Sequence, residues 1–169
     1  MIRLITHTEK PEELLRENYS QCYQKEINYE KMIQFLKHES VLEHIVFHFE
    51  ISASRVCWEQ LVRHRLSSFT AQSHRYTEPT KEDTHYFIPS EILNMPQEMV
   101  LEWIDDCEHS HDVYMKWRNR GVKKETARYQ INKGVKINAR VTMNLRSVIN
   151  FLALRTDSHA QEEIKLMAQ

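Results

Sequence analysis

The residues best suited to chemistry lie close together in the stretch 63–76, RHRLSSFTAQSHRY. This stretch holds no acidic residue and five residues that carry or can carry a positive charge: Arg63, His64, Arg65, His74 and Arg75. Guanidinium groups held close together repel one another unless an anion is present, and arginine binds phosphate through paired hydrogen bonds. The Ser and Thr hydroxyls between them can add donors. The pattern favours an anion site, although an isolated basic cluster is more often a solvated loop.

A net charge of −1 conceals an uneven distribution of charge along the chain. Between Glu78 and Asp112 many acidic residues stand against one base, Lys81, whereas residues 126–155 include six bases and no acid. Two basic segments separated by an acidic one predict a localised anion site rather than a general polyanion-binding surface. Aromatic residues do not alternate with the arginines, so an RNA-binding protein is the weaker hypothesis and we expect no nucleic-acid partner.

The composition is that of a globular protein. A chain of 169 residues is the size of one domain, and we expect a single domain over residues 1–169. No apolar run could span a bilayer, and the N-terminus lacks the apolar segment of a signal peptide, so we expect no membrane partner. Cys22, Cys57 and Cys107 are widely spaced and suggest neither a disulfide framework nor a CxxC metal motif. These features favour a cytoplasmic protein.

The periodicity of apolar residues predicts both strands and helices. Apolar and polar residues alternate over His44–Ile51 and Val135–Met143, and shorter strands are expected at Ile2–Thr6 and Tyr86–Ile88. Helical spacing predicts the other elements, and Gly121 is expected to end the longest helix. The expected helices are a segment that begins at Pro11, Tyr29–Lys37, Ala53–Arg63, Glu98–Arg118, Leu145–Leu154 and Ala160–Met167.

Several other kinds of site are excluded by spacing. With two glycines the chain can form neither a GxGxxG turn nor a P-loop. His44 and His48 would lie about 13 Å apart on a strand, too far for one metal ion, so we expect no metal site. Residues 157–159, Asp-Ser-His, are adjacent and cannot adopt the geometry of a hydrolytic triad. No cysteine has an obvious activating base nearby.

The spacing of the basic stretch, RHR and then seven residues before Ser73, resembles the signature of the flavin-dependent thymidylate synthases. Other segments resemble the same family, in the same order, from His38 to Gln161. They are His38-Glu39-Ser40 with the strand after it, Gln60 three residues before Arg63, Glu125-Thr126-Ala127-Arg128, and the block from Asn144 to Gln161. The chain departs from the family at Thr70-Ala71, where many members have Asn-Glu, and at His74, which replaces Gly or Gln. It also ends sooner after Gln161 than members usually do.

The resemblance implies an α/β fold with a mixed, partly antiparallel sheet flanked by helices. The implied reaction is reductive methylation of dUMP to dTMP, with methylenetetrahydrofolate as carbon donor, FAD as hydride carrier and NADPH as reductant. Family members form homotetramers with shared active sites. The alternative, suggested by Thr70-Ala71 and the short C-terminus, is a catalytically silent flavin- or nucleotide-binding homologue.

The resemblance also implies a role for each matching position. Arg155 would lie against the uracil and favour loss of the N3 proton, since a fixed cation stabilises the resulting anion. His38 would lie beside the flavin ring, where folate stacks. The residues expected to contact FAD are His38, Ser40, Arg63, His64, Arg65, Asn144, Arg146 and Asn150. Those expected to contact dUMP are Gln60, Arg63, Gln72, Ser73, His74, Arg75, Arg128 and Arg155.

Each of these residues has a simpler interpretation in isolation. Arg146 and Asn150 are four residues apart on a predicted helix and could pair with each other. Asn144 is an ordinary N-cap. Arg63 and Arg155 lie at predicted helix C-termini, where the helix dipole favours a cation. At the family's spacing, taken together, the functional interpretation is preferred.

Overall fold

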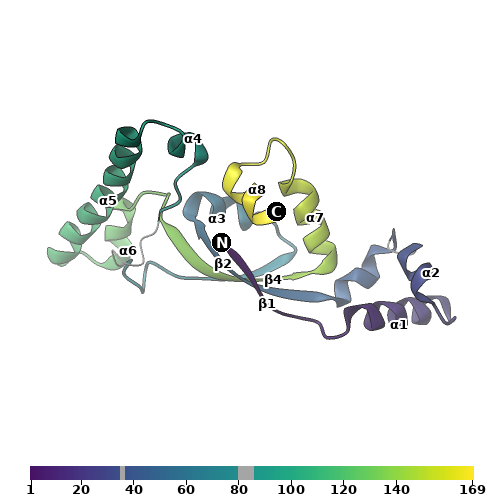
Figure 1. The fold of residues 1–169 in the computed structure, drawn as a ribbon. Helices are drawn as coiled ribbons and strands as arrows, with labels where there is room; N and C mark the ends of the chain where they lie inside the picture. Colours follow the sequence, from purple (N-terminus) through teal and green to yellow (C-terminus); the bar gives the residue numbers. More distant parts are fainter. Residues whose placement is uncertain (35–36, 80–85) are drawn as a thin grey trace.

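Four antiparallel strands form a sheet at the centre of an elongated chain, with helices beyond both of its ends (Figure 1). The computed structural model describes residues 1–34, 37–79 and 86–169. The strands lie in the order β1-β2-β4-β3. Their bounds are Ile2–His7 for β1, Val46–Ser54 for β2, Ser67–Ala71 for β3 and Lys136–Asn144 for β4. The predicted α/β architecture is confirmed, and every pair of neighbouring strands is antiparallel.

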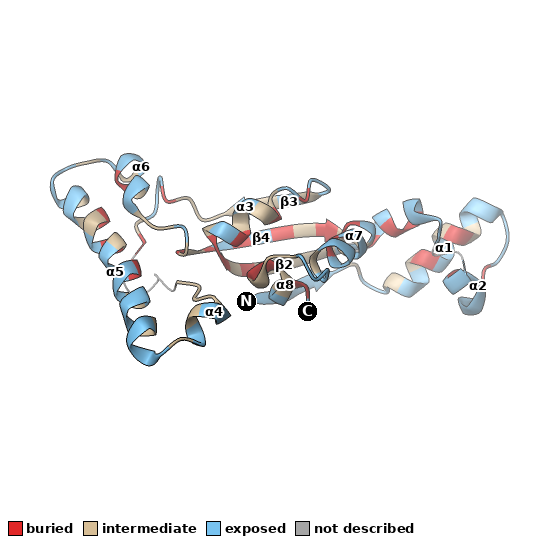
Figure 2. Cartoon of the chain, turned by 90° about the horizontal axis from the view of Figure 1, so that it is seen from above, coloured by how far each residue is buried: buried red, intermediate tan, exposed pale blue. Residues whose placement is uncertain are grey.

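One face of the sheet carries the main apolar core. Apolar residues alternate along both central strands, and the register pairs Phe49 with Val141 and Ile51 with Ala139. Every second residue of β4 is therefore buried, and Figure 2 shows the buried residues of this strand in red. Three helices cover this face, α3 (Arg55–Leu61), α7 (Leu145–Arg155) and α8 (Glu162–Ala168). The residues that form the core are Ile51, Ala53, Cys57, Leu61, Ala139, Val141, Met143, Phe151, Ile164 and Ala168.

The opposite face of the sheet is polar. His48 on β2 forms a hydrogen bond of 2.8 Å with the hydroxyl of Thr142 on β4. Glu50 forms salt bridges with Arg3 on β1 and, at 3.0 Å, with Arg140 on β4. These polar and charged pairs across neighbouring strands stabilise the sheet on this face.

A helical arm lies beyond one end of the sheet (Figure 1). It consists of α1 (Pro11–Tyr23), α2 (Tyr29–Gln34) and the 3₁₀ segment η2 (Glu39–His44). These elements share a second core of Leu15, Tyr19, Ile27, Met32, Val41, Leu42 and Ile45. Residues 35–36 of the helix predicted to reach Lys37 lie outside the described residues.

The arm at the other end is built on α5 (Gln97–Asn119), with the short helices α4 (Ser90–Leu93) and α6 (Lys124–Ala127). As predicted, α5 ends at a glycine in the left-handed region, Gly121, with φ of 85°. The Gly121 N–H donates to the Arg118 carbonyl at 2.9 Å and the Val122 N–H to the Trp117 carbonyl at 3.1 Å. This is a Schellman motif, which satisfies the last carbonyls of the helix.

Several sequence-based expectations need correction. The strand expected over His44–Ile51 begins at Val46 and runs to Ser54, and His44 belongs to η2. The basic stretch is not wholly a loop, because its residues Ser67–Ala71 form β3. The helix predicted over Ala53–Arg63 is shorter: Ala53 still belongs to β2, and α3 ends at Leu61. Tyr86 makes only an isolated bridge to Val135 instead of starting a strand. Among the described residues, no helix is long and apolar enough to span a bilayer.

Candidate functional site

Strand β3 divides the basic stretch into two halves at opposite ends of the strand. The first half, residues 63–66, lies beside α7, and the second half, residues 72–77, lies beside α3 and α6. Four residue steps separate Ser67 from Ala71, which corresponds to about 13 Å along a strand. The two halves of the basic stretch, although close in the sequence, therefore lie in two different regions of the chain.

A fixed turn follows β3. The Gln72 N–H donates to the Asn138 carbonyl at 2.8 Å, which extends the pairing of the strands by one residue. The Ser73 carbonyl then accepts from the N–H groups of Tyr76 and Thr77, at 3.0 and 2.9 Å. This turn holds the predicted phosphate-contacting residues Ser73, His74 and Arg75 in a defined backbone geometry.

His74 is buried in this turn and lies against an arginine that sequence reasoning missed. The Nη1 group of Arg55 lies 3.3 Å from Nδ1 of His74. Burial lowers the pKa of His74, and the guanidinium groups of Arg55 and Arg128 lower it further. The imidazole therefore stays neutral, so that Nδ1 accepts from Arg55 and the remaining ring N–H can donate.

Two contacts with α6 bring Arg75 and Arg128 to the same place. Arg75 forms a salt bridge of 3.4 Å with the carboxylate of Glu125, and Nε of Arg128 donates to the Glu125 carbonyl at 3.2 Å. We refer to Arg55, His74, Arg75 and Arg128 as the cationic cluster. Within the described residues, neither Arg55 nor Arg128 forms a salt bridge. The cluster therefore carries positive charge that an anion could neutralise.

Arg155, the predicted catalytic residue, ends α7 and reaches across to α3. Its Nη2 group donates to the Gln60 carbonyl at 3.5 Å. Its Nε–H is buried and has no hydrogen-bond partner in the described part of the chain. The side chain is thus held at one nitrogen while another still lacks an acceptor. Because Gln60 lies in the last turn of α3, this bond agrees with the simpler interpretation of Arg155 as a cation at a helix C-terminus.

His64 occupies a buried position in the first half of the basic stretch. Its Nε2–H donates to the Ser147 hydroxyl and carbonyl, at 2.8 and 3.0 Å, and the Ser147 hydroxyl donates to the Leu66 carbonyl at 2.7 Å. These bonds fasten the turn before β3 to α7. The neighbouring Arg63 and Arg65 are exposed, and their guanidinium groups form no salt bridge with any described residue.

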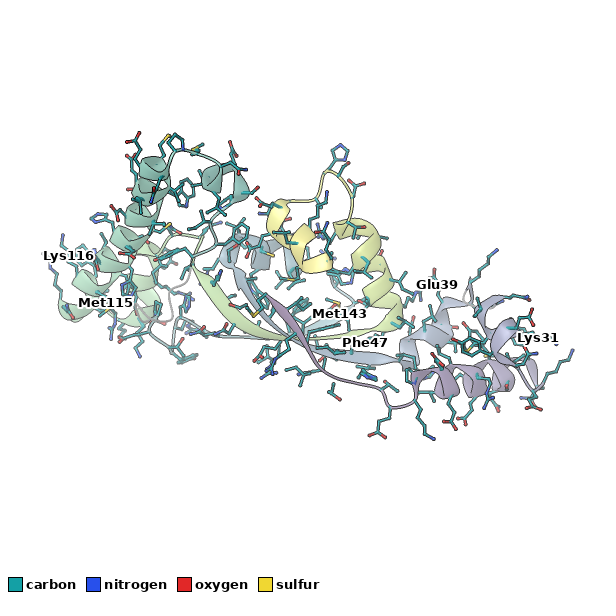
Figure 3. All side chains as sticks on the ribbon, viewed as in Figure 1. Lys31, Glu39, Phe47, Met115, Lys116 and Met143 are labelled. Carbon is teal, nitrogen blue, oxygen red and sulfur yellow. The ribbon has the colours of Figure 1, made fainter. Side chains whose placement is uncertain are left out.

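A cavity of about 480 Å³ opens beside α7 near this turn, and we call it the α7 cavity. Apolar and polar residues both contribute to its walls: Glu39, Leu42, Leu66, Arg146, Ile149, Asn150 and Ala153. Arg146 forms salt bridges with Glu39 at 2.9 Å and with Glu43 at 2.6 Å. The hydrogen bond that Arg146 donates to Glu43 raises the pKa of Arg146, and Glu39 adds to the effect. Figure 3 marks Glu39 at the junction of the helical arm and the sheet.

Of the predicted flavin residues, Arg146 and Asn150 line this cavity, and the others lie on neighbouring elements. Asn144 is the N-cap of α7, where its side chain accepts from the Ser147 N–H at 2.8 Å. Ser40 is exposed on η2, and His38 is exposed directly before it, with its ring 5.8 Å from that of Tyr23. Arg146 pairs with carboxylates rather than with Asn150, so the pairing considered from the sequence does not occur.

The two residues that depart from the family signature lie on β3. Thr70 pairs with Arg140 and is exposed, whereas Ala71 pairs with Ala139 and packs against the main core. The position at which many family members carry glutamate is therefore occupied here by a small apolar side chain of the covered face.

The structure is thus an α/β domain with the cationic cluster at one end of β3 and the α7 cavity near the other end. A family model described as thymidylate synthase complementing protein matches residues 3–169. Together with the relatives described below, this match shows that the chain belongs to that family.

Curated relatives named flavin-dependent thymidylate synthase are similar to the chain. The one from Pyrococcus furiosus is 42% identical over 135 residues, which cover 78% of this chain and 54% of the relative. The one from Sulfurisphaera tokodaii is 41% identical over 130 residues, covering 76% and 49%. The chain spans about half the length of these relatives.

Proposed function

We propose that the chain catalyses the reductive methylation of dUMP to dTMP. The single observation that carries this proposal is the cationic cluster: the fold brings together basic residues that are far apart in the sequence and leaves two of them without carboxylate partners. A nucleotide phosphate matches such a cluster in charge and in geometry. The names of the curated relatives support the same assignment.

In this proposal the phosphate of dUMP lies in the cationic cluster, against Arg55, Arg75 and Arg128. Gln72, Ser73 and the second ring nitrogen of His74 would add neutral donors on the same turn. The predicted contacts of Gln60 and Arg63 with the nucleotide are retained. Arg155 bonds the Gln60 carbonyl, so Arg155 and Gln60 would together contact the uracil ring of the nucleotide.

Arg155 supplies the chemical step of the proposal. A guanidinium group beside the uracil stabilises the anion left when the N3 proton is lost, which activates the ring. The Arg155 guanidinium, held at Nη2 by the Gln60 carbonyl, would be the cation that stabilises that anion. Nothing in this step requires a cysteine, and burial raises the pKa of Cys57 to about 12, so this thiol is a poor nucleophile.

The α7 cavity is the proposed flavin site. Its apolar wall, with Leu66 and Ile149, suits an aromatic ring, and Arg146 and Asn150 supply polar contacts. When bound there, FAD would supply hydride chemistry, with NADPH as the reductant and methylenetetrahydrofolate as the carbon donor. The remaining residues assigned to FAD in the proposal are His38, Ser40, Arg63, His64, Arg65 and Asn144. His64 would act from its buried position, by holding the turn that carries Arg63 and Arg65.

We further propose a cytoplasmic homotetramer in which a complete site draws on more than one copy. The separation of the two halves of the basic stretch by β3 supports this, because a nucleotide and a flavin that react must lie in contact. A second copy would bring the α7 cavity of one chain to the cationic cluster of another.

Absorption spectroscopy followed by a turnover assay tests the proposal. Purified chain supplemented with FAD should show a bound-flavin spectrum that changes on addition of dUMP, and should form dTMP when methylenetetrahydrofolate and NADPH are added. Arg155→Ala should abolish dTMP formation while the protein stays folded. Arg140→Ala, on the polar face of the sheet, is the matched control and should retain turnover. Undiminished turnover in Arg155→Ala would overturn the assigned role.

A second candidate is a catalytically silent flavin- or nucleotide-binding homologue. The apolar environment of Ala71 and the two carboxylates on Arg146 favour it. Flavin binding without dTMP formation in the same assay would support this candidate, and dTMP formation would eliminate it.

A further inference from the structure

Three consecutive side chains at the start of α8 each accept a hydrogen bond from a different segment. Gln161 accepts from the Gln60 side chain at 3.4 Å. Glu162 accepts from the backbone N–H of Ser90 at 3.0 Å, and Glu163 from the backbone N–H of Ser54 at 2.7 Å. Figure 1 shows α8 beside α3, so this first turn connects α3 and α4 to the last helix.

Glu163 is the most deeply buried of the three, with 7% of its surface exposed. One carboxylate oxygen accepts from the Ser54 N–H and the other from the Ser54 hydroxyl. The Ser54 hydroxyl in turn accepts from the Cys57 N–H at 3.0 Å and so caps α3. A buried carboxylate is unfavourable unless it is hydrogen-bonded, so the position of Ser54 is coupled to that of Glu163.

Ser54 directly precedes Arg55 of the cationic cluster. Because Ser54 is both the end of β2 and the N-cap of α3, its backbone sets the direction in which Arg55 leaves the sheet. That direction brings the Arg55 guanidinium to 3.3 Å from His74. Glu163 is joined to the cluster through Ser54, and among the described residues no salt bridge links it directly to a cluster arginine.

We infer that Glu163 is a positioning residue for phosphate recognition: it holds Ser54 so that Arg55 enters the cationic cluster. The inference rests on the proposed function, since it assigns the cluster to the nucleotide phosphate. A positioning residue differs from one that only stabilises the fold. Loss of the Glu163 carboxylate should weaken binding of the phosphate and leave binding of the nucleoside unchanged.

The test compares Glu163→Ala and Glu163→Gln with Glu162→Gln, using the full chain with FAD. Glu162 is the matched control because it lies on the same turn but bonds α4, which carries no residue of the proposed site. Affinities for dUMP and for deoxyuridine, which lacks the phosphate, are measured by calorimetry. Loss of a well-placed charged contact should weaken dUMP binding about tenfold in Glu163→Ala and about threefold in Glu163→Gln. Deoxyuridine binding should not change, and Glu162→Gln should resemble the unmodified chain for both ligands.

A second measurement does not depend on nucleotide binding. Nuclear magnetic resonance titration of the His74 ring should give a higher pKa in the Glu163 variants, because a displaced Arg55 no longer opposes protonation of the imidazole. If Glu163→Ala does not fold, Glu163→Gln provides both measurements.

The two failures can be told apart. Equal weakening of dUMP and deoxyuridine, or an unchanged His74 titration with unchanged dUMP affinity, would overturn the positioning role while the proposed function stands. Absence of dUMP binding by the unmodified chain would overturn the proposed function, and with it the inference.

Discussion

The cationic cluster and the α7 cavity both hold arginines, but they differ in what surrounds those arginines. In the cluster, Arg55 and Arg128 have no carboxylate partner among the described residues, and their field helps to keep His74 neutral. In the cavity, Arg146 is held by two carboxylates, Glu39 and Glu43. The first region is prepared for an anion before any ligand arrives. The second can bind an anion only if Arg146 exchanges its partners.

This difference has an energetic consequence. Hydrogen bonds that involve a charged group contribute about 1.5–3 kcal/mol each. A cation without a salt-bridge partner breaks no such contact when it binds a ligand, so this free energy favours binding undiminished. A cation already in an exposed salt bridge must give up a contact worth about 0–1 kcal/mol. We therefore expect phosphate contacts in the cluster to contribute more to binding than the contact made by Arg146.

The largest effect should come from removing the unpaired cations. The double variant Arg55→Ala/Arg128→Ala should lower dUMP affinity by about a hundredfold or more, because two charged hydrogen bonds to the phosphate are lost. Calorimetric titration measures this directly. Deoxyuridine serves as the control ligand, and a double variant that still bound dUMP with the original affinity would show that the phosphate lies elsewhere.

An intermediate effect should come from changing the partners of Arg146. Arg146→Ala should weaken FAD binding about tenfold, whereas Glu39→Gln/Glu43→Gln should strengthen it severalfold, because the guanidinium is then released. FAD affinity is measured by flavin fluorescence. Opposite changes of this affinity in the two variants would show that the carboxylates compete with the ligand for Arg146, unlike in the cationic cluster. Weaker FAD binding in both would mean that the ion pairs shape the cavity rather than compete with the ligand.

The smallest effect should be the pH dependence that arises from His74. Its pKa in the folded chain is lowered from the ordinary value of 6.5. The unfolded chain therefore binds more protons between the two pKa values, and stability rises with pH there. The contribution of neutral His74 to the free energy of unfolding is complete above pH 6.5. It is lost as the pH falls from 6.5 toward the pKa of His74 in the folded chain. Denaturant unfolding from pH 7.5 to 5 should show this loss in the unmodified chain and less of it in His74→Gln. Identical profiles would contradict it.

The parts of the fold with a strong local pattern could be predicted from the sequence. The alternation over Val135–Met143 identified β4 to within one residue at each end, and Asn144 and Gly121 took the capping roles expected of them. These features depend on neighbours in the sequence, so local reasoning is sufficient. The single domain over residues 1–169 and the roles of the site residues stay predictions.

The features that were missed depend on the order of the strands. Ser67–Ala71 is short and polar, and only its pairing with β4 and the packing of Phe69 against Trp58 identify it as a strand. Arg55 belongs to none of the motifs found in the sequence. Its contact with His74 exists because β3 lies beside β4, which in turn pairs with β2, and no local pattern encodes that arrangement.

The pairing of β3 with β4 restricts how the length of the signature can vary. Ser67 to Ala71 faces Met143 to Ala139 residue by residue. Inserting or deleting one residue would either turn Phe69 away from Trp58 to the polar face or move His74 by about 3.3 Å relative to Arg55. The interval between Arg63 and Ser73 should therefore accept changes of residue type far more readily than changes of length.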